Sequence, residues 1–135
     1  MSVRILIADD DPTIRRLLRR LLETHSEWQV TVEAADGAEA VEKARRFVPD
    51  LAVLDLVMPG MNGLQAAQAI SSQNPDALML LITVQHLSQQ HLDAARSAGF
   101  RGAVTKDRGQ EIVKAVEAVL KNELYFHLEE YTSVG

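Results

Sequence analysis

The chain has 135 residues, no cysteine, and a formal net charge of −5 from 19 acidic and 14 basic residues. This length suits a single domain, and 47% hydrophobic residues are enough for a core, which argues against disorder. The lack of cysteine excludes disulfides and thiolate metal sites, and the acidic balance argues against direct contact with nucleic acid. No apolar run reaches the roughly 20 residues that span a bilayer, and no signal-like segment opens the chain. We therefore expect a cytoplasmic protein with no membrane contact.

Five short aliphatic and β-branched runs predict β-strands. Several of them, such as "LAVL" and "LMLLIT", are apolar throughout, which is typical of strands buried on both faces of a parallel sheet. In chain order the predicted strands are Val3–Ala8, Gln29–Ala34, Leu51–Leu54, Ala77–Thr83 and Gly102–Thr105.

Helical patterns separate these strands. The first helix is predicted from apolar residues at helical spacing between Ile14 and Leu22, with four arginines on its other side, and with Asp11 as N-cap and Pro12 as its first residue. The later predicted helices cover approximately Gly37–Phe47, Gly63–Gln73, Ser88–Ser97 and Gln110–Leu124. Five strands alternating with five helices predict an α/β doubly wound parallel sheet.

Polar residues stand where four of the predicted strands end. Asp9 and Asp10 follow the first strand, Asp55 follows the third, and Thr83 and Lys106 end the fourth and fifth. Sites in such sheets form at the carboxyl ends of strands, near the point where the strand order reverses. If the first strand lies between the second and third, the three aspartates converge. Carboxylates this close repel one another unless they share a hard cation, so we predict a Mg²⁺ site, with Mn²⁺ as the alternative.

Four stretches in this order, "ILIADDDP", "DLVMPGMNG", "LLITVQ" and "GAVTKD", resemble the receiver domain of two-component response regulators. The resemblance extends from about Val3 to Leu120. It implies a flavodoxin-like (βα)5 fold with strand order 2-1-3-4-5. We therefore expect a receiver domain over residues 1–124, followed at 125–135 by a tail or the start of a linker.

The resemblance also implies a role for each acidic residue. Asp55 would accept a phosphoryl group from the phosphohistidine of a histidine kinase or phosphotransfer domain, or from a small phosphodonor. Asp10, Asp55 and the backbone carbonyl of Val57 would hold Mg²⁺, and Asp9 would contribute through water. The domain would then be a regulatory phosphoacceptor and not an enzyme.

The remaining residues of the motifs would bind the phosphoryl group or shape the backbone around it. Thr83 and Lys106 would each contact a phosphoryl oxygen, while Pro59 and Gly63 would shape the turn after the third strand. The sequence departs from the family pattern at Ala103, where many receivers have Tyr or Phe. We therefore expect output to pass through the loop after the fourth strand and the helix that follows.

The ending "KD", followed by "AVEAVLKNELYFH", is similar to the NarL/LuxR-type branch of the family. This likeness implies a homodimer on phosphorylation and a helix-turn-helix output domain that would contact DNA and is not in this sequence. We favour a piece of a longer transcriptional regulator over a natural single-domain receiver.

Two other functions stay open at this point. The chain could serve as a phosphorylation-independent interaction module, which Ala103 favours, or as a Mg²⁺-dependent phosphohydrolase. The hydrolase is disfavoured because such enzymes usually need a second aspartate as general acid two residues after the nucleophile, and Val57 occupies that position. The arginines of the first helix are either a solvated face or a docking surface for the kinase, and Trp28, Phe100 and Phe126 are predicted to be packing residues.

Overall fold

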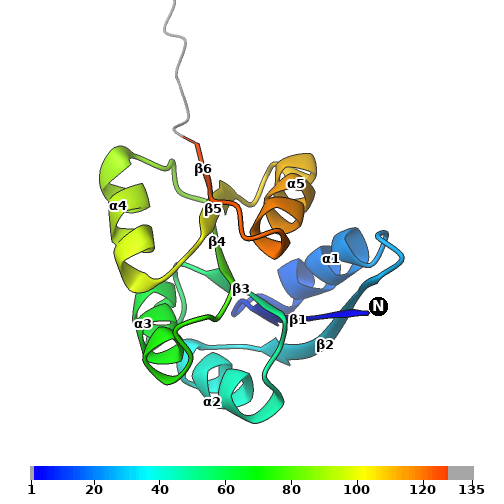
Figure 1. The fold of residues 1–135 in the computed structure, drawn as a ribbon, viewed down its shortest axis with the longest axis horizontal. Helices are drawn as coiled ribbons and strands as arrows, with labels where there is room; N and C mark the ends of the chain where they lie inside the picture. The colour runs from blue at the N-terminus through cyan, green and yellow to red at the C-terminus, as the bar shows by residue number, and fades with distance from the viewer. Residues whose placement is uncertain (1, 128–135) are drawn as a thin grey trace, which may run out of the picture.

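Short apolar strands alternate with amphipathic helices to give one parallel six-stranded sheet with helices on both faces (Figure 1). The protein is described from a computed structural model over residues 2–127. Its elements, in chain order, are β1 (Val3–Ala8), α1 (Pro12–Leu22), β2 (Trp28–Ala34), α2 (Gly37–Phe47), β3 (Leu51–Asp55), α3 (Gly63–Gln73), β4 (Met79–Thr83), α4 (Gln89–Ala98), β5 (Gly102–Thr105), α5 (Gly109–Leu120) and β6 (Tyr125–Phe126).

The strand order is β2-β1-β3-β4-β5-β6, which confirms the predicted flavodoxin-like order 2-1-3-4-5 and adds one strand at the edge. β1 pairs with both β2 and β3, so the chain moves outward from β1 first in one direction and then in the other. The reversal lies between β1 and β3, and their carboxyl ends are therefore adjacent.

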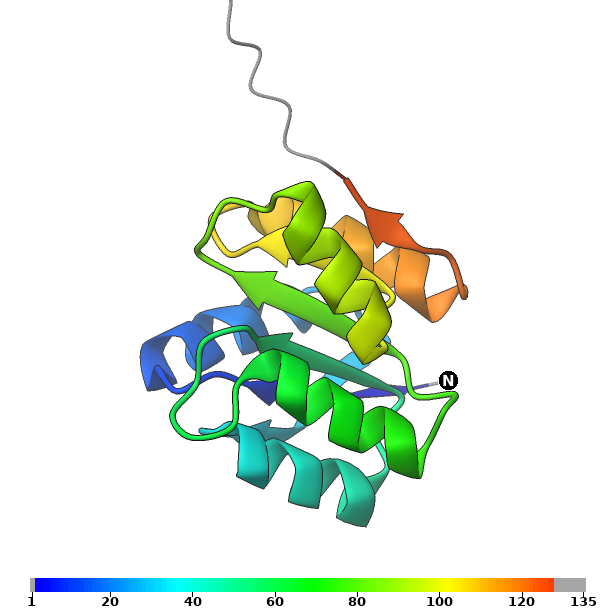
Figure 2. The ribbon, with the colours of Figure 1, turned by 90° about the vertical axis from the view of Figure 1, so that its left-hand side faces the viewer.

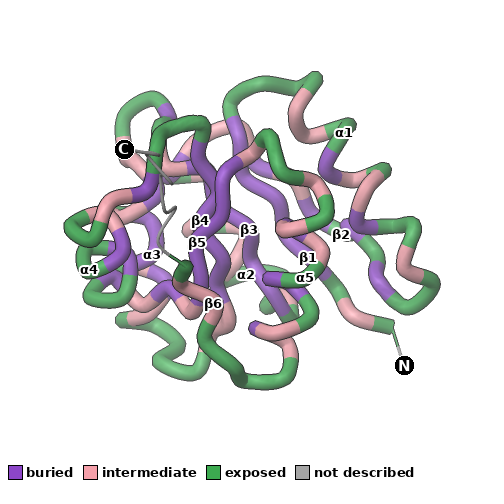
Figure 3. Tube along the Cα trace, turned by 90° about the horizontal axis from the view of Figure 1, so that it is seen from above, coloured by how far each residue is buried: buried purple, intermediate pink, exposed green. Residues whose placement is uncertain are grey.

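The helices divide between the two faces of the sheet. α1 and α5 cover one face, whereas α2, α3 and α4 lie side by side on the other (Figures 1 and 2). Successive residues of β1 show the division: Ile5 and Ile7 pack with α1 and α5, while Leu6 and Ala8 pack on the opposite side. The central strands are buried along their length (Figure 3) because both of their faces are covered.

Local hydrogen bonds fix where the helices begin. The Asp11 carboxylate accepts the Thr13 N–H at 2.8 Å, which confirms Asp11 as the N-cap of α1. α3 and α4 begin with capping boxes at Asn62 and Ser88. Among residues 2–127, no helix combines the length and the apolarity that crossing a bilayer requires.

The C-terminal part of the domain differs from the prediction. The helix predicted to reach Leu124 ends at Leu120, so that boundary was wrong. Asn122 has a left-handed backbone with φ of 63°, a conformation that asparagine tolerates and that stops the helix. The chain then forms β6, although we expected residues 125 and 126 to lie in a tail. Residues 128–135, the rest of that predicted tail, lie outside the described part of the chain.

β6 is fixed to both neighbouring helices. Its register pairs Tyr125 with Gly102 and Phe126 with Ala103. The Tyr125 hydroxyl donates to Glu111 of α5, and burial together with this bond raises the pKa of Tyr125 to about 12. On the other side, the Arg96 guanidinium of α4 lies 5.4 Å from the centre of the Phe126 ring. Phe126 is thus a packing residue, as predicted; the buried rings of Trp28 and Phe100 are two more.

Candidate functional site

Three aspartates meet at the carboxyl edge of the sheet. β1 and β3 pair in a register that sets Ala8 opposite Leu54, so Asp9 and Asp55, one residue further along, are neighbours. One carboxylate oxygen each of Asp9, Asp10 and Asp55 lies within 4.8 Å of the others. Asp9 and Asp55 are buried, whereas Asp10 is exposed to solvent. The predicted convergence of the three is confirmed, and an all-oxygen cluster open to water on one side is a donor set that could hold a hard divalent metal ion.

Lys106 is the cation of this cluster. Its Nζ lies 2.7 Å from Asp9 Oδ2 and 3.2 Å from Asp55 Oδ2, and its side chain is only 12% exposed. The backbone holds it there, since the Lys106 N–H donates to the Thr83 carbonyl at 2.8 Å across β4 and β5. One ammonium group therefore offsets part of the charge of two buried carboxylates.

The balance of charge shifts two pKa values upward. Burial raises the pKa of Asp55 above its ordinary value, and the Asp9 carboxylate adds to the rise, while Lys106 and a backbone hydrogen bond from Val57 oppose it. For Lys106, burial opposes the charged form, but the contacts with Asp9 and Asp55 outweigh it and its pKa is raised. Lys106 thus stays protonated, and the site favours a further positive charge beside Asp55.

Thr83 ends β4 next to this cluster. Asp55 pairs in register with Ile82, so Thr83 stands one residue beyond the carboxylate on the adjacent strand. Its side chain is buried, and its Oγ1 accepts the Gln85 N–H at 3.1 Å. The hydroxyl proton of Thr83 is therefore available for another acceptor at this edge.

The turn after β3 requires close contact between backbone segments. The Gly63 N–H donates to the Leu56 carbonyl at 2.9 Å, and a Cβ at position 63 would overlap the carbonyl oxygen of Asp55. Gly60 has a φ of 70° just after the exposed Pro59. Glycine at position 63 thus lets the turn return to the base of the site.

Arg15 supports the site in a way that the sequence did not indicate. Its Nη1 donates to the Asp9 carbonyl at 2.6 Å, and its Nε donates to Glu33 of β2 at 3.0 Å. Arg19 binds the other oxygen of Glu33 at 2.6 Å. Burial raises the pKa of Glu33, but hydrogen bonds from both arginines outweigh it and leave that pKa lowered. These two arginines are therefore part of an ion-pair network and not simply a solvated face.

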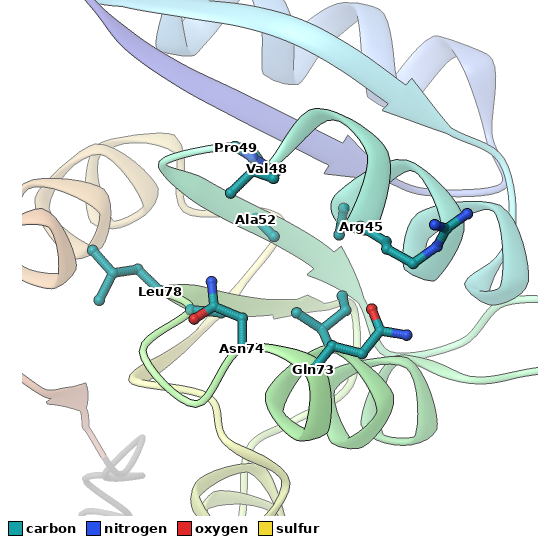
Figure 4. Close-up of a pocket in the computed structure, with 10 residues that line it drawn as sticks. Arg45, Val48, Pro49, Ala52, Gln73, Asn74 and Leu78 are labelled. Carbon is teal, nitrogen blue, oxygen red and sulfur yellow. The ribbon is translucent and has the colours of Figure 1, made fainter.

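An apolar pocket lies apart from this site. It has a volume of about 270 Å³ and lies between the ends of α2 and α3, beside the starts of β3 and β4 (Figure 4). This is the amino end of the strands, opposite the aspartates. Its lining is mostly aliphatic and also includes the polar residues Arg45, Gln73 and Asn74.

The fold and the site together define a class of protein: a doubly wound α/β domain with an acidic, lysine-containing site where its strand order reverses. Within that class, the chain belongs to the response regulator receiver domain family, whose family model matches residues 5–117. The match includes the three aspartates, Thr83 and Lys106.

Solved structures and characterised relatives agree with this assignment. A LuxR-family two-component response regulator from Aurantimonas sp. SI85-9A1 is 35% identical with a TM-score of 0.89, covering 96% of this chain and 91% of that one. The signal receiver domain of the putative response regulator NarL from Mycobacterium tuberculosis is 37% identical with a TM-score of 0.83, over 90% and 98% of the two chains.

Among curated proteins, the nitrate/nitrite response regulator NarP of Escherichia coli is 36% identical over 91% of this chain. A protein-glutamate methylesterase/protein-glutamine glutaminase of Myxococcus xanthus is 38% identical over 81%. The chain spans 57% and 31% of their lengths, respectively. It is therefore a receiver domain of two-component response regulators with NarL/LuxR-type neighbours.

Proposed function

We propose that Asp55 is the phosphoacceptor of this receiver domain and that Mg²⁺ is the metal ion its reaction uses. The observation that carries the proposal is the meeting of Asp9, Asp10 and Asp55 within 4.8 Å beside the ammonium group of Lys106. Mg²⁺ prefers such oxygen ligands and keeps several waters, and Mn²⁺ has similar preferences.

The transfer is a displacement at phosphorus. An Asp55 carboxylate oxygen attacks, a new O–P bond forms, and the P–N bond of a phosphohistidine breaks with its electron pair returning to the imidazole nitrogen. A bound Mg²⁺, held by Asp10, Asp55 and the carbonyl of Val57, with Asp9 contributing through water, would neutralise charge on the transferring group. Lys106 binds one phosphoryl oxygen as a compact cation, and the Thr83 hydroxyl donates to another.

The domain is proposed to act as a switch and not as an enzyme. Phosphorylation adds negative charge at the edge between Asp55 and the loop after β4, and shifts the balance between two conformers. Val57 is 57% exposed and its side chain is apolar, so it supplies no general acid for rapid hydrolysis of the phosphoaspartate.

Partners are proposed from the family and the neighbours. A histidine kinase or phosphotransfer domain would supply the phosphoryl group, and a LuxR-type helix-turn-helix domain, present in a longer chain, would bind DNA in the cytoplasm. Because Arg15 and Arg19 are held by Glu33, the exposed Arg16 and Arg20 are the arginines of α1 that a kinase would contact. Homodimerisation on phosphorylation is part of this proposal.

Ala103 favours one alternative, a receiver that binds a partner without phosphorylation. With alanine at this position, there is no aromatic ring to which a movement of Thr83 could be transmitted. Incubation with acetyl phosphate and Mg²⁺, followed by intact-mass measurement, separates the functions. We expect a gain of one phosphoryl group that is lost in Asp55→Asn or with EDTA and kept in the exposed-site control Asp76→Asn. No mass gain would favour the interaction module, and steady release of phosphate over many turnovers would favour a hydrolase.

A further inference from the structure

A buried hydroxyl lies beside Thr83 on the neighbouring strand. Thr105 is the register partner of Thr83 in the β4–β5 pair and directly precedes Lys106. Thr105 is 7% exposed, and its Oγ1 makes no hydrogen bond to any residue of the described range 2–127. Within residues 2–127, Asp9 Oδ2 is the other buried side-chain oxygen of this kind, and it has Lys106 at 2.7 Å. Thr105 has no such compensation.

An unpaired buried hydroxyl destabilises the folded state, and valine would fill the same volume without that cost. The presence of threonine at position 105 is explained if its hydroxyl group has a hydrogen-bond partner in another conformation of the domain. Register and alternation identify the candidate. Ala103 and Leu81 pack on the face covered by α2, α3 and α4, so Thr105 and Thr83, two residues further along each strand, stand on that same face. Adjacent strands are about 4.8 Å apart, which places the two hydroxyl groups within reach after rotation about χ1.

The order of the strands gives the direction of the contact. β4 lies between β3, which ends in Asp55, and β5, which ends in Thr105. Thr83 therefore has the proposed phosphoacceptor on one side and the unpaired hydroxyl on the other. At present its Oγ1 accepts the Gln85 N–H at 3.1 Å, a bond within the loop after β4.

We propose that Thr105 is a positioning residue that holds Thr83 in its phosphoryl-binding rotamer by donating its hydroxyl proton to Thr83 Oγ1. Thr83 then donates its own proton to the phosphoryl oxygen on Asp55, so the two hydroxyl groups form a chain that ends on an anion. Such chains strengthen their members, because each bond polarises the next. The exchange of the Gln85 bond for the Thr105 bond would also release the loop after β4. This inference rests on the proposed role of Asp55.

The test uses substitutions that remove only the hydroxyl or only the methyl group. The proposal expects two effects of opposite sign in Thr105→Val. The melting temperature of the unliganded domain should rise by about 2–6 °C, because the unpaired hydroxyl is gone. Binding of beryllofluoride with Mg²⁺, a mimic of the phosphoryl group, should weaken by about three- to tenfold, because Thr83 loses its donor.

Rescue and coupling distinguish positioning from packing. Thr105→Ser, which keeps the hydroxyl, should restore binding, whereas Thr105→Ala should bind as weakly as Thr105→Val. In a Thr83→Ala background, Thr105→Val should cause no further loss. The exposed strand position Thr31 provides the matched control, and Thr31→Val should change neither quantity.

Binding of beryllofluoride by Thr105→Val as tight as that of the wild type would overturn this inference and leave the role of Asp55 standing. An equal loss in the Thr83→Ala background would overturn it too, since the effect would not pass through Thr83. Two results would overturn the proposed function, and this inference with it. One is that the wild-type domain does not bind beryllofluoride, and the other is that the Asp55→Asn variant binds it as tightly as the wild type.

Discussion

The apolar middle of the sheet and its carboxyl edge are both buried, but burial has opposite consequences in the two regions. In the middle, side chains such as Leu6 lose contact with water and fill space between sheet and helices, which stabilises the fold. At the edge, the buried groups are Asp9 and Asp55, and the largely buried Lys106 contacts both of them. Their charges lose hydration and are only partly compensated by one another. The middle therefore contributes stability, and the edge retains charges that the fold alone does not need.

The largest expected effect tests the apolar region. Leu6→Ala should lower the free energy of unfolding by about 2–5 kcal/mol, because it leaves a cavity in a fully buried layer. Chemical denaturation measures this change. The exposed Leu17 of α1 gives the control, and Leu17→Ala should stay within about 0.5 kcal/mol of the wild type. Similar losses for the two variants would show that the middle of the sheet is not the source of stability.

At the edge, removal of the cation should destabilise the protein without creating a large cavity. Lys106→Met keeps most of the side-chain volume but leaves two buried carboxylates without a counter-charge, at a cost of about 2–3 kcal/mol in EDTA. Mg²⁺ should recover part of that loss through binding to the acids. The control is Lys114→Met, at an exposed position of α5. If Lys106→Met is no less stable than that control, the ion pairs do not hold the edge together.

Removal of a carboxylate should stabilise the folded protein, in contrast to removal of the cation. Asp55→Asn should stabilise the metal-free domain by about 1 kcal/mol at neutral pH, because a buried charge next to Asp9 is relieved. The raised pKa of Asp55 means that its ionisation opposes folding. The gain should therefore be full above that raised pKa and shrink as the pH falls, until it disappears below the ordinary pKa of the unfolded chain, where the carboxyl is protonated in both states. Thermal unfolding across the acid range, with Asp76→Asn as control, checks this. A destabilised Asp55→Asn in EDTA would contradict the picture of a costly edge.

The smallest effect concerns the network behind the site. Glu33→Gln removes the ion pairs with Arg15 and Arg19 and should cost about 0.5–1 kcal/mol at neutral pH. The pKa of Glu33 is lowered in the folded protein, so its contribution is present above the unfolded value and is lost as the pH falls through the folded one. The difference from wild type should vanish in acid. A loss that persists there would assign the cost to packing, and a loss no larger than that of the exposed control Glu117→Gln would show that the ion pairs contribute nothing.

The comparison also explains what the sequence could predict. The central strands could be predicted because continuous apolar runs such as "LMLLIT" have one good explanation in a protein of this size. The meeting of Asp9, Asp10 and Asp55 followed from topology, since a reversal of strand order beside β1 places the ends of β1 and β3 together.

Contacts made by single side chains across the fold could not be predicted in this way. The pairing of Arg15 with Glu33 depends on how α1 lies over β2, which helical periodicity does not specify. β6 has only two residues and no alternation, so its docking against Ala103 left no recognisable pattern. The end of α5 did leave a signal, because Asn122 is a residue that tolerates a left-handed backbone and so indicates a helix end before it.

The most direct test of the account identifies the atom that takes the phosphoryl group. After incubation with acetyl phosphate and Mg²⁺, reduction with borohydride converts an acyl phosphate into an alcohol and so leaves homoserine in place of aspartate. The account predicts homoserine at position 55, dependent on both the phosphodonor and Mg²⁺, as found by sequencing peptides in a mass spectrometer. Homoserine at position 9 or 10, or at no position in a fully folded sample, would contradict it.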